Sequence, residues 1–128
     1  MAYSIWATGR FYTKLSANKI NIGSRILKRL KEMDIDKIDL KLSYTEILDN
    51  PYKYLSGDLF KKGDYCPETA EKIHDERIYV RDDLCEGMEI EDGSEVVVIG
   101  IPMKDKKILE ILRKKDYDLI KHDSSRFD

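Results

Sequence analysis

The run of residues 96–101, Val-Val-Val-Ile-Gly-Ile, constrains the fold of this chain more than any other segment. A continuous apolar run rich in β-branched residues is typical of a strand that is buried on both faces. The run is far shorter than the about 20 apolar residues that span a bilayer. We therefore expect the chain to fold around a central strand here, with further structure covering both of its faces.

The spacing of apolar residues predicts the elements around this strand. Alternation predicts strands over residues 3–15, 19–22, 36–43, 77–81 and 117–120. Helical spacing predicts helices near 24–33, 67–74 and 104–115, the first with Ser24 as its N-cap. Residues 44–66 follow neither spacing clearly, so we expect either a surface excursion or a poorly marked hairpin there. The prediction is a single α+β domain over 1–122 with a mixed five- or six-stranded sheet or small barrel and about three helices, followed by a polar tail over 123–128.

Composition favours a folded intracellular domain. The 128 residues are 41% apolar and 38% charged, which is too apolar for a disordered chain. We expect neither a membrane span nor an export signal, because the first residues lack a charged segment followed by an apolar one. Cys66 and Cys85 are then expected to be reduced thiols in the cytoplasm. The absence of glutamine fits either a heat-adapted source or an AT-rich genome.

Charge is unevenly placed along the chain although the net charge is only −2. Residues 82–95 hold seven acids and no base, whereas residues 104–115 hold six bases against two acids. Such segments often only solvate a fold, or complement each other within it or across an oligomer. They can also contact a partner of opposite charge, so both are candidate interaction surfaces.

Two segments of the chain share one layout. Residues 19–42 and 77–99 each read strand, helical turn, apolar-x-apolar, strand, and in the second copy a glycine-marked turn over 87–96 leads into the valine-rich strand. This pattern resembles the repeat unit of cradle-loop barrels, which are the swapped-hairpin transition regulators of the AbrB type and the double-psi barrels. The resemblance covers about 25 residues per copy, under half the chain, and implies a small barrel. Ser94 stands where these repeats usually carry aspartate, and no DNA contact is carried over to any residue.

Protein–protein contact is the function that the sequence favours, in a small non-enzymatic regulatory or binding module. Tyrosines beside segregated charge are typical of interface hot spots. The expected contact surfaces are the excursion at 44–66 and the acidic stretch at 82–95, and the expected contact residues are Tyr52, Tyr54, Phe60, Asp82, Asp83 and Glu86. On an exposed loop, Tyr52 and Tyr54 could be replaced by Ala with little change in the thermal midpoint. The expected partner is another protein, with a homo-oligomer as an alternative and no membrane involved.

Nucleic-acid binding is the alternative function. A strand face that alternates aromatic and cationic side chains suits single-stranded nucleic acid, and basic helix faces suit phosphates. The residues for this role are Trp6, Arg10, Tyr12, Arg25, Lys28, Arg29, Arg113 and Lys114. The near-neutral net charge weighs against it, because phosphate neutralisation supplies most non-specific affinity.

A small enzyme with a site near Cys66 and His74 is the second alternative. A thiol at the start of a helix would be partly activated, but eight residues of helix would separate the two side chains by about 12 Å, too far for a hydrogen bond. The chain has no CxxC or HxxxH spacing and no glycine-rich phosphate loop. We therefore expect no metal and no cofactor, and we assign no catalytic residue.

Overall fold

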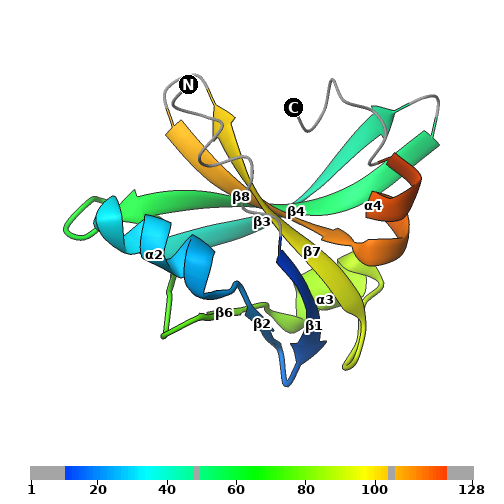
Figure 1. Ribbon diagram of the computed structural model, residues 1–128, viewed down its shortest axis with the longest axis horizontal. Coiled ribbons are helices and arrows are strands. Elements are labelled where there is room, and N and C mark those ends of the chain that lie inside the picture. The colour runs from blue at the N-terminus through cyan, green and yellow to red at the C-terminus, as the bar shows by residue number, and fades with distance from the viewer. Residues whose placement is uncertain (1–10, 48–49, 104–105, 121–128) are drawn as a thin grey trace.

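The strands of the chain form one antiparallel sheet that curls until its two edges nearly meet. The computed structural model describes residues 11–47, 50–103 and 106–120. The strands are β1 (Phe11–Ser16), β2 (Lys19–Asn21), β3 (Ile35–Ile47), β4 (Asn50–Lys61), β5 (Glu71–Lys72), β6 (Arg77–Tyr79), β7 (Glu95–Met103) and β8 (Lys106–Arg113), and the helices are α2 (Ser24–Glu32), α3 (Asp82–Met88) and α4 (Lys114–Ile120). Their arrangement is shown in Figure 1.

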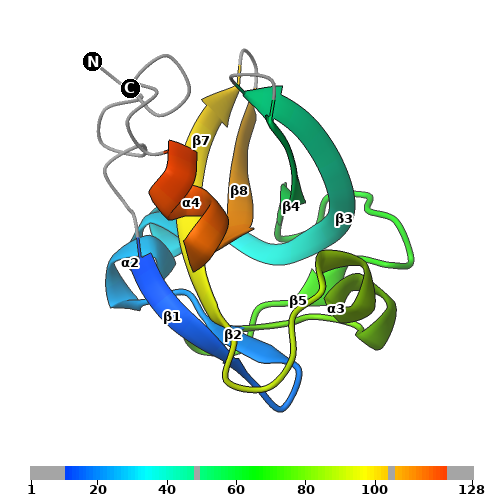
Figure 2. The ribbon, with the colours of Figure 1, turned by 90° about the vertical axis from the view of Figure 1, so that its right-hand side faces the viewer.

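The strand order in the sheet is β5-β3-β4-β8-β7-β1-β2-β6, and every neighbouring pair is antiparallel. Figure 2 shows the sheet curling around an interior, and the edge strands β5 and β6 lie close together. A single α+β domain is thus confirmed, and the nearly closed sheet fits the small-barrel form of the prediction better than the mixed-sheet form. Across the described residues the sheet is antiparallel and has eight strands, more than the five or six predicted. Within the described ranges, no helix is long and apolar enough to cross a membrane.

The main core fills the interior of the curled sheet. Alternation places Ile38 and Leu40 of β3 in this core, and Ile20 of β2 meets Ile78 of β6 with both side chains fully buried. Helices α2 and α3 add their apolar faces from the two ends of the sheet, through side chains such as Leu30. Each such side chain contributes about 1.5–3 kcal/mol by leaving water.

Strand β7 is buried on both faces, as the apolar run predicts. Val96 and Val98 belong to the main core, whereas Val97 and Ile99 belong to a second cluster on the outer face of the sheet. This outer cluster consists of Tyr52, Val97, Ile99, Leu112 and Tyr117, with Tyr54 packed against it. Helix α4 lies over β7 and supplies Tyr117 (Figure 1).

The excursion predicted at 44–66 is wrong as a loop, and the alternative of a poorly marked hairpin is right. Strands β3 and β4 pair continuously from Lys37 with Phe60 to Ile47 with Asn50. Alternation is hard to see in β4 because both of its faces are covered. Leu55 enters the main core, while Tyr52 on the opposite face enters the outer cluster.

The helix predicted at 104–115 and the edge strand predicted at 117–120 are also wrong. Residues 106–113 form β8, and residues 114–120 form α4. The apolar residues over 108–112 fit helical spacing, but they fit a strand covered on both faces equally well. Leu109 and Ile111 face the main core, and Leu112 faces the outer cluster. Long-range pairing with β4 and β7 therefore overrides the local pattern.

The helix predicted at 67–74 is wrong as well. Residues 67–70 form a turn closed by the N–H of Ala70 and the carbonyl of Pro67 at 3.0 Å, and β5 follows. Ser24 is the first residue of α2 and not its N-cap, a position that Gly23 occupies with a φ of 84°. The strand–helix–strand layout expected in both segments is present, as β2–α2–β3 and as β6–α3–β7.

Candidate functional site

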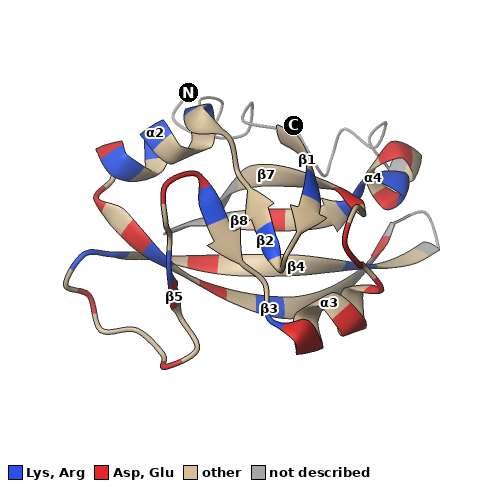
Figure 3. Ribbon diagram, turned by 90° about the horizontal axis from the view of Figure 1, so that it is seen from below, with Lys and Arg blue, Asp and Glu red and all other residues tan. Residues whose placement is uncertain are grey.

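The acidic stretch folds into α3 and the loop after it, and its carboxylates lie on the outside. Leu84, Cys85 and Met88 are buried beneath the helix, so their neighbours Asp82, Asp83 and Glu86 are exposed. In Figure 3, acidic residues occupy α3, while Lys and Arg are prominent on α2 in another part of the molecule. We define the acidic surface as Asp82, Asp83, Glu86 and Asp92.

The turn between β1 and β2 is hydrogen-bonded to two members of the acidic surface, Asp82 and Asp92. The Asn18 side-chain amide donates to Asp82 Oδ1 at 2.7 Å, and the Ala17 N–H donates to Asp92 Oδ1 at 3.0 Å. Asp83 accepts a bond from Arg81 Nε at 3.2 Å at an exposed position. Glu86 has no side-chain partner among the described residues. Two of these acids are thus hydrogen-bonded to the turn, and Asp83 is the one member of the surface with a cation partner among the described residues.

The thiol of Cys85 lies close enough to the acidic surface for the carboxylates there to add to the effect of burial on the thiol pKa. Its pKa is raised, first by burial and then by the charges of Asp82, Asp92 and Asp83. Asp82, Asp83 and Asp92 therefore act on the same thiol. These effects favour the protonated form of the thiol, and Cys85 packs in the main core.

The aromatic candidates of the protein-binding hypothesis lie in the sheet and not on an exposed loop. Tyr52 is only 6% exposed and belongs to the outer cluster, and Tyr54 packs against that cluster with its ring centroid 6.0 Å from that of Tyr52. Phe60 is half-buried on β4, opposite Lys37 of β3. The expectation of dispensable, exposed tyrosines is therefore corrected.

Replacing Tyr52 with Ala is expected to lower the free energy of unfolding by about 2 kcal/mol, because a buried ring leaves a cavity in the outer cluster. Chemical denaturation measured by circular dichroism checks this value. Tyr65, which is 98% exposed, provides the control, and its replacement with Ala should change the free energy by less than about 0.5 kcal/mol. Equal effects of the two substitutions would contradict the burial of Tyr52.

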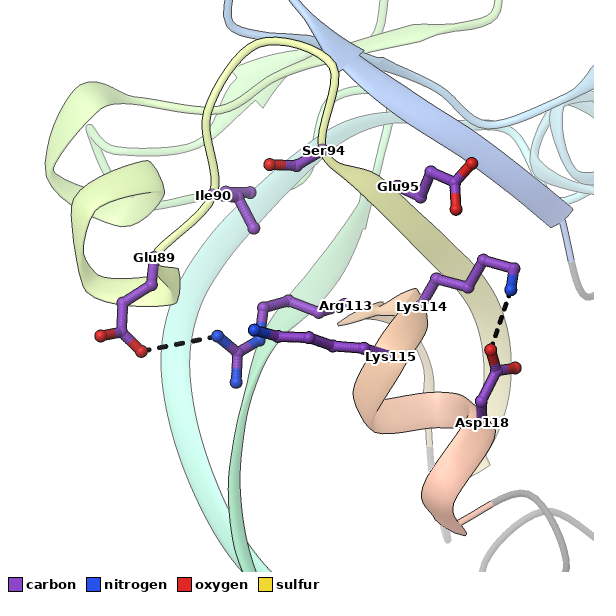
Figure 4. A pocket seen from close by; sticks show the side chains of 8 residues that line it. All are labelled: Glu89, Ile90, Ser94, Glu95, Arg113, Lys114, Lys115 and Asp118. Carbon is purple, nitrogen blue, oxygen red and sulfur yellow. Dashed lines mark hydrogen bonds and ion pairs between the residues drawn. The ribbon is translucent and has the colours of Figure 1, made fainter.

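A groove beside α4 gathers two of the cations from the nucleic-acid hypothesis. It has a volume of about 340 Å³ and is lined by Glu89, Ile90, Ser94, Glu95, Arg113, Lys114, Lys115 and Asp118 (Figure 4). Arg113 Nε lies 2.7 Å from Asp116 Oδ2, and one of its terminal nitrogens lies 3.5 Å from Glu89 Oε2. Lys114 Nζ lies 2.8 Å from Asp118 Oδ2. Both cations are thus engaged by carboxylates.

The ion pairs of Arg113 are part of a larger network of ion pairs, which the sequence analysis did not predict. Lys53 of β4 also reaches Glu89, at 3.7 Å, so the carboxylate after α3 links β4 to β8 and, through Asp116, to α4. Lys53 and Arg113 are both distant from Glu89 in the sequence, so no local spacing relates these two pairs, whereas Arg113 and Asp116 are an i,i+3 pair. The network therefore connects β4, β8 and α4 through the residue that follows α3.

Tyr12 lies next to this groove. A smaller hollow of about 180 Å³ is lined by Tyr12, Thr13, Lys14, Glu95 and Lys114, and it shares Glu95 and Lys114 with the groove. The Tyr12 ring is 52% exposed and meets Tyr117 edge to face, with 6.0 Å between the ring centroids. The structure therefore brings Tyr12, Arg113 and Lys114 together.

The remaining nucleic-acid candidates do not join this group. Arg25, Lys28 and Arg29 lie on α2, where Arg29 is paired with Glu32 at 3.2 Å. Trp6 and Arg10 lie outside the described residues.

Cys66 and His74, the candidates for an enzyme site, do not share a helix. Cys66 precedes the turn at 67–70 and lies 3.9 Å from Lys37 Nζ, whereas His74 is exposed in a turn closed against Arg77. In the described part of the chain, no three His, Cys, Asp or Glu side chains gather closely enough to hold a metal ion.

Comparison with known proteins adds no assignment: no family model, no curated protein and no solved structure matches this chain.

Proposed function

We propose that this protein is a non-enzymatic binding module that contacts a basic segment of another protein through its acidic surface. One observation carries the proposal: the carboxylates of α3 are exposed and largely unneutralised, whereas the cations expected to contact phosphate are mostly paired. Arg29, Arg113 and Lys114 each have a carboxylate within 3.2 Å. Glu86 has none of the described cations beside it, and Asp82 is bonded to a neutral amide.

Two features of the acidic surface suit it to binding. Helix α3 is anchored by Leu84 and Met88, which are 6% and 0% exposed, so its outward carboxylates are held in place before a partner arrives. Exposed charges of one sign steer an oppositely charged partner and speed its association. An arginine-rich segment is the complement, because guanidinium groups bind carboxylates with two parallel hydrogen bonds.

A titration with a fluorescently labelled arginine-rich peptide tests the proposal. Anisotropy should rise with protein concentration, and the affinity should fall as salt is increased from low to physiological concentration. A peptide of the same length with lysines and arginines replaced by glutamates should not bind. Absence of binding by the basic peptide at low salt would contradict the proposal.

A second candidate function is single-stranded nucleic-acid binding beside α4. The exposed Tyr12 ring, next to Lys14 and Lys114 in one hollow, is the observation that favours it, because bases stack on aromatic rings flanked by cations. A labelled oligonucleotide in the same assay tests it. If this candidate is correct, Tyr12→Ala should weaken oligonucleotide binding by about tenfold.

We also propose a cytoplasmic location and a fold built from two related units. Both cysteines are free thiols, which supports a reducing compartment. The units β2–α2–β3 and β6–α3–β7 have the same element order, and their first strands pair with each other. This arrangement supports the resemblance to cradle-loop barrels, and it assigns no contact residue.

A further inference from the structure

The edge strands β5 and β6 follow each other through a tight turn, and the residues that flank this turn, His74 and Arg77, are paired through their backbones. His74 and Arg77 exchange both backbone hydrogen bonds, at 3.2 and 2.9 Å, around a two-residue turn. In a continuing antiparallel hairpin, Lys72 and Tyr79 would form the next hydrogen-bonded pair. Among the described strand pairs, Lys72 and Tyr79 are not partners: β5 is paired with β3, and β6 is paired with β2.

The backbone groups of Lys72 and Tyr79 nevertheless point toward the gap between β5 and β6. The N–H of Ile22 bonds the carbonyl of Glu76, and the N–H of Val80 bonds that of Asn18, so the alternating pattern directs the Tyr79 amide away from β2. By the same reasoning, the bond from Ile73 to Asp36 directs the Lys72 amide away from β3. The N–H and the carbonyl of Lys72 and of Tyr79 therefore all point into this seam.

A small cavity fills the seam, and cationic side chains surround it. Its volume is about 170 Å³, and its lining includes Lys19, Lys72, His74 and Arg77 together with Glu71 and Asp75. Because Ile20 and Ile78 face the core, their neighbours Lys19 and Arg77 share the outer face of the sheet. Among the described residues, none of the three cations Lys19, Lys72 and Arg77 has a carboxylate partner.

We propose that this seam cavity, with Lys72 and Arg77 in its lining, binds a phosphate group. Arginine and lysine side chains are common partners of phosphate oxygens, and the N–H groups of Lys72 and Tyr79 can add hydrogen bonds to the anion. The cavity is smaller than the about 300–1,000 Å³ of pockets for organic ligands, so it suits a tetrahedral anion. The acids favour phosphate over sulfate, because a protonated phosphate oxygen can donate to the Glu71 or Asp75 carboxylate and sulfate has no such donor.

Isothermal titration calorimetry with inorganic phosphate at constant ionic strength tests the site. Arg77→Ala and Lys72→Ala should each weaken phosphate binding by about tenfold, because each removes a charge-assisted hydrogen bond. Lys28→Ala, which removes an exposed cation from α2, should leave the affinity unchanged. The thermal midpoints of all three variants should match that of the wild type, since these side chains are exposed.

Two comparisons decide between outcomes. Sulfate should bind at least about tenfold more weakly than phosphate; equal binding of the two ions, or wild-type affinity in the Arg77→Ala Lys72→Ala double variant, would overturn the proposal. Methyl phosphate distinguishes the source of the phosphate group. Tighter binding of inorganic phosphate indicates the free ion, whereas equal or tighter binding of methyl phosphate indicates a phosphate monoester on a larger ligand.

Discussion

Replacing Gly57 with valine is expected to lower the free energy of unfolding by about 3 kcal/mol. Gly57 lies in the middle of β4 with Leu40 of β3 and Leu109 of β8 beside it. A Cβ atom at this position would lie 2.4 Å from Ile38 Cδ1 and 3.1 Å from Leu40 Cδ2. Ile38 is 1% exposed and cannot move aside without displacing other core side chains. Urea denaturation followed by circular dichroism measures the loss.

The matched control is the neighbouring residue on the opposite face of the same strand. Ser56→Val adds a side chain of similar size at a half-buried position, and we expect it to change the free energy by less than about 1 kcal/mol. If the Gly57 variant is as stable as the Ser56 variant, the tight packing of Ile38 across β4 is wrong, and with it the close curvature of the sheet.

Reversing two charges of the acidic surface should reduce binding of the arginine-rich peptide by about a hundredfold. The variant combines Asp83→Lys with Glu86→Lys, and it replaces attraction by repulsion at two exposed positions. Asp82 and Asp92 are left in place because they bond the turn between β1 and β2. Anisotropy titrations at about 0.1 M salt measure the affinity.

A control variant separates this local effect from that of net charge. Glu46→Lys with Glu68→Lys makes the same change in total charge at two exposed acids outside the acidic surface. Its affinity for the peptide should stay within about threefold of the wild type, because charges beyond a Debye length of about 10 Å are screened. An equal loss in both variants would show that the peptide responds only to net charge.

The parts of the fold that follow from local patterns could be predicted from the sequence. β7 is apolar on both faces because it is covered on both, and α2 shows its buried stripe of Ile26 and Leu30. The segment over 106–113 could not be assigned, because a strand buried on both faces and a helix share its apolar spacing. Only the pairing with β4 and β7 makes it a strand.

The candidate site was predictable to a similar extent. The acids of 82–95 lie in one short segment of the sequence, so their shared location follows from the chain itself. The burial of Tyr52 and the pairing of Arg113 with Glu89 depend on contacts between distant segments. The open hairpin at the seam likewise depends on β5 and β6 choosing different partners, which no local pattern specifies.

Mapping the bound peptide onto the protein by NMR tests the proposed function most directly. In a titration of isotope-labelled protein with the arginine-rich peptide, we predict that the largest amide shift changes lie in residues 82–88, at Asp92 and in the turn at Ala17 and Asn18. These residues form or contact the acidic surface. Shift changes centred instead on Tyr12, Lys14 and Lys114, or spread evenly over the molecule, would contradict a contact through α3.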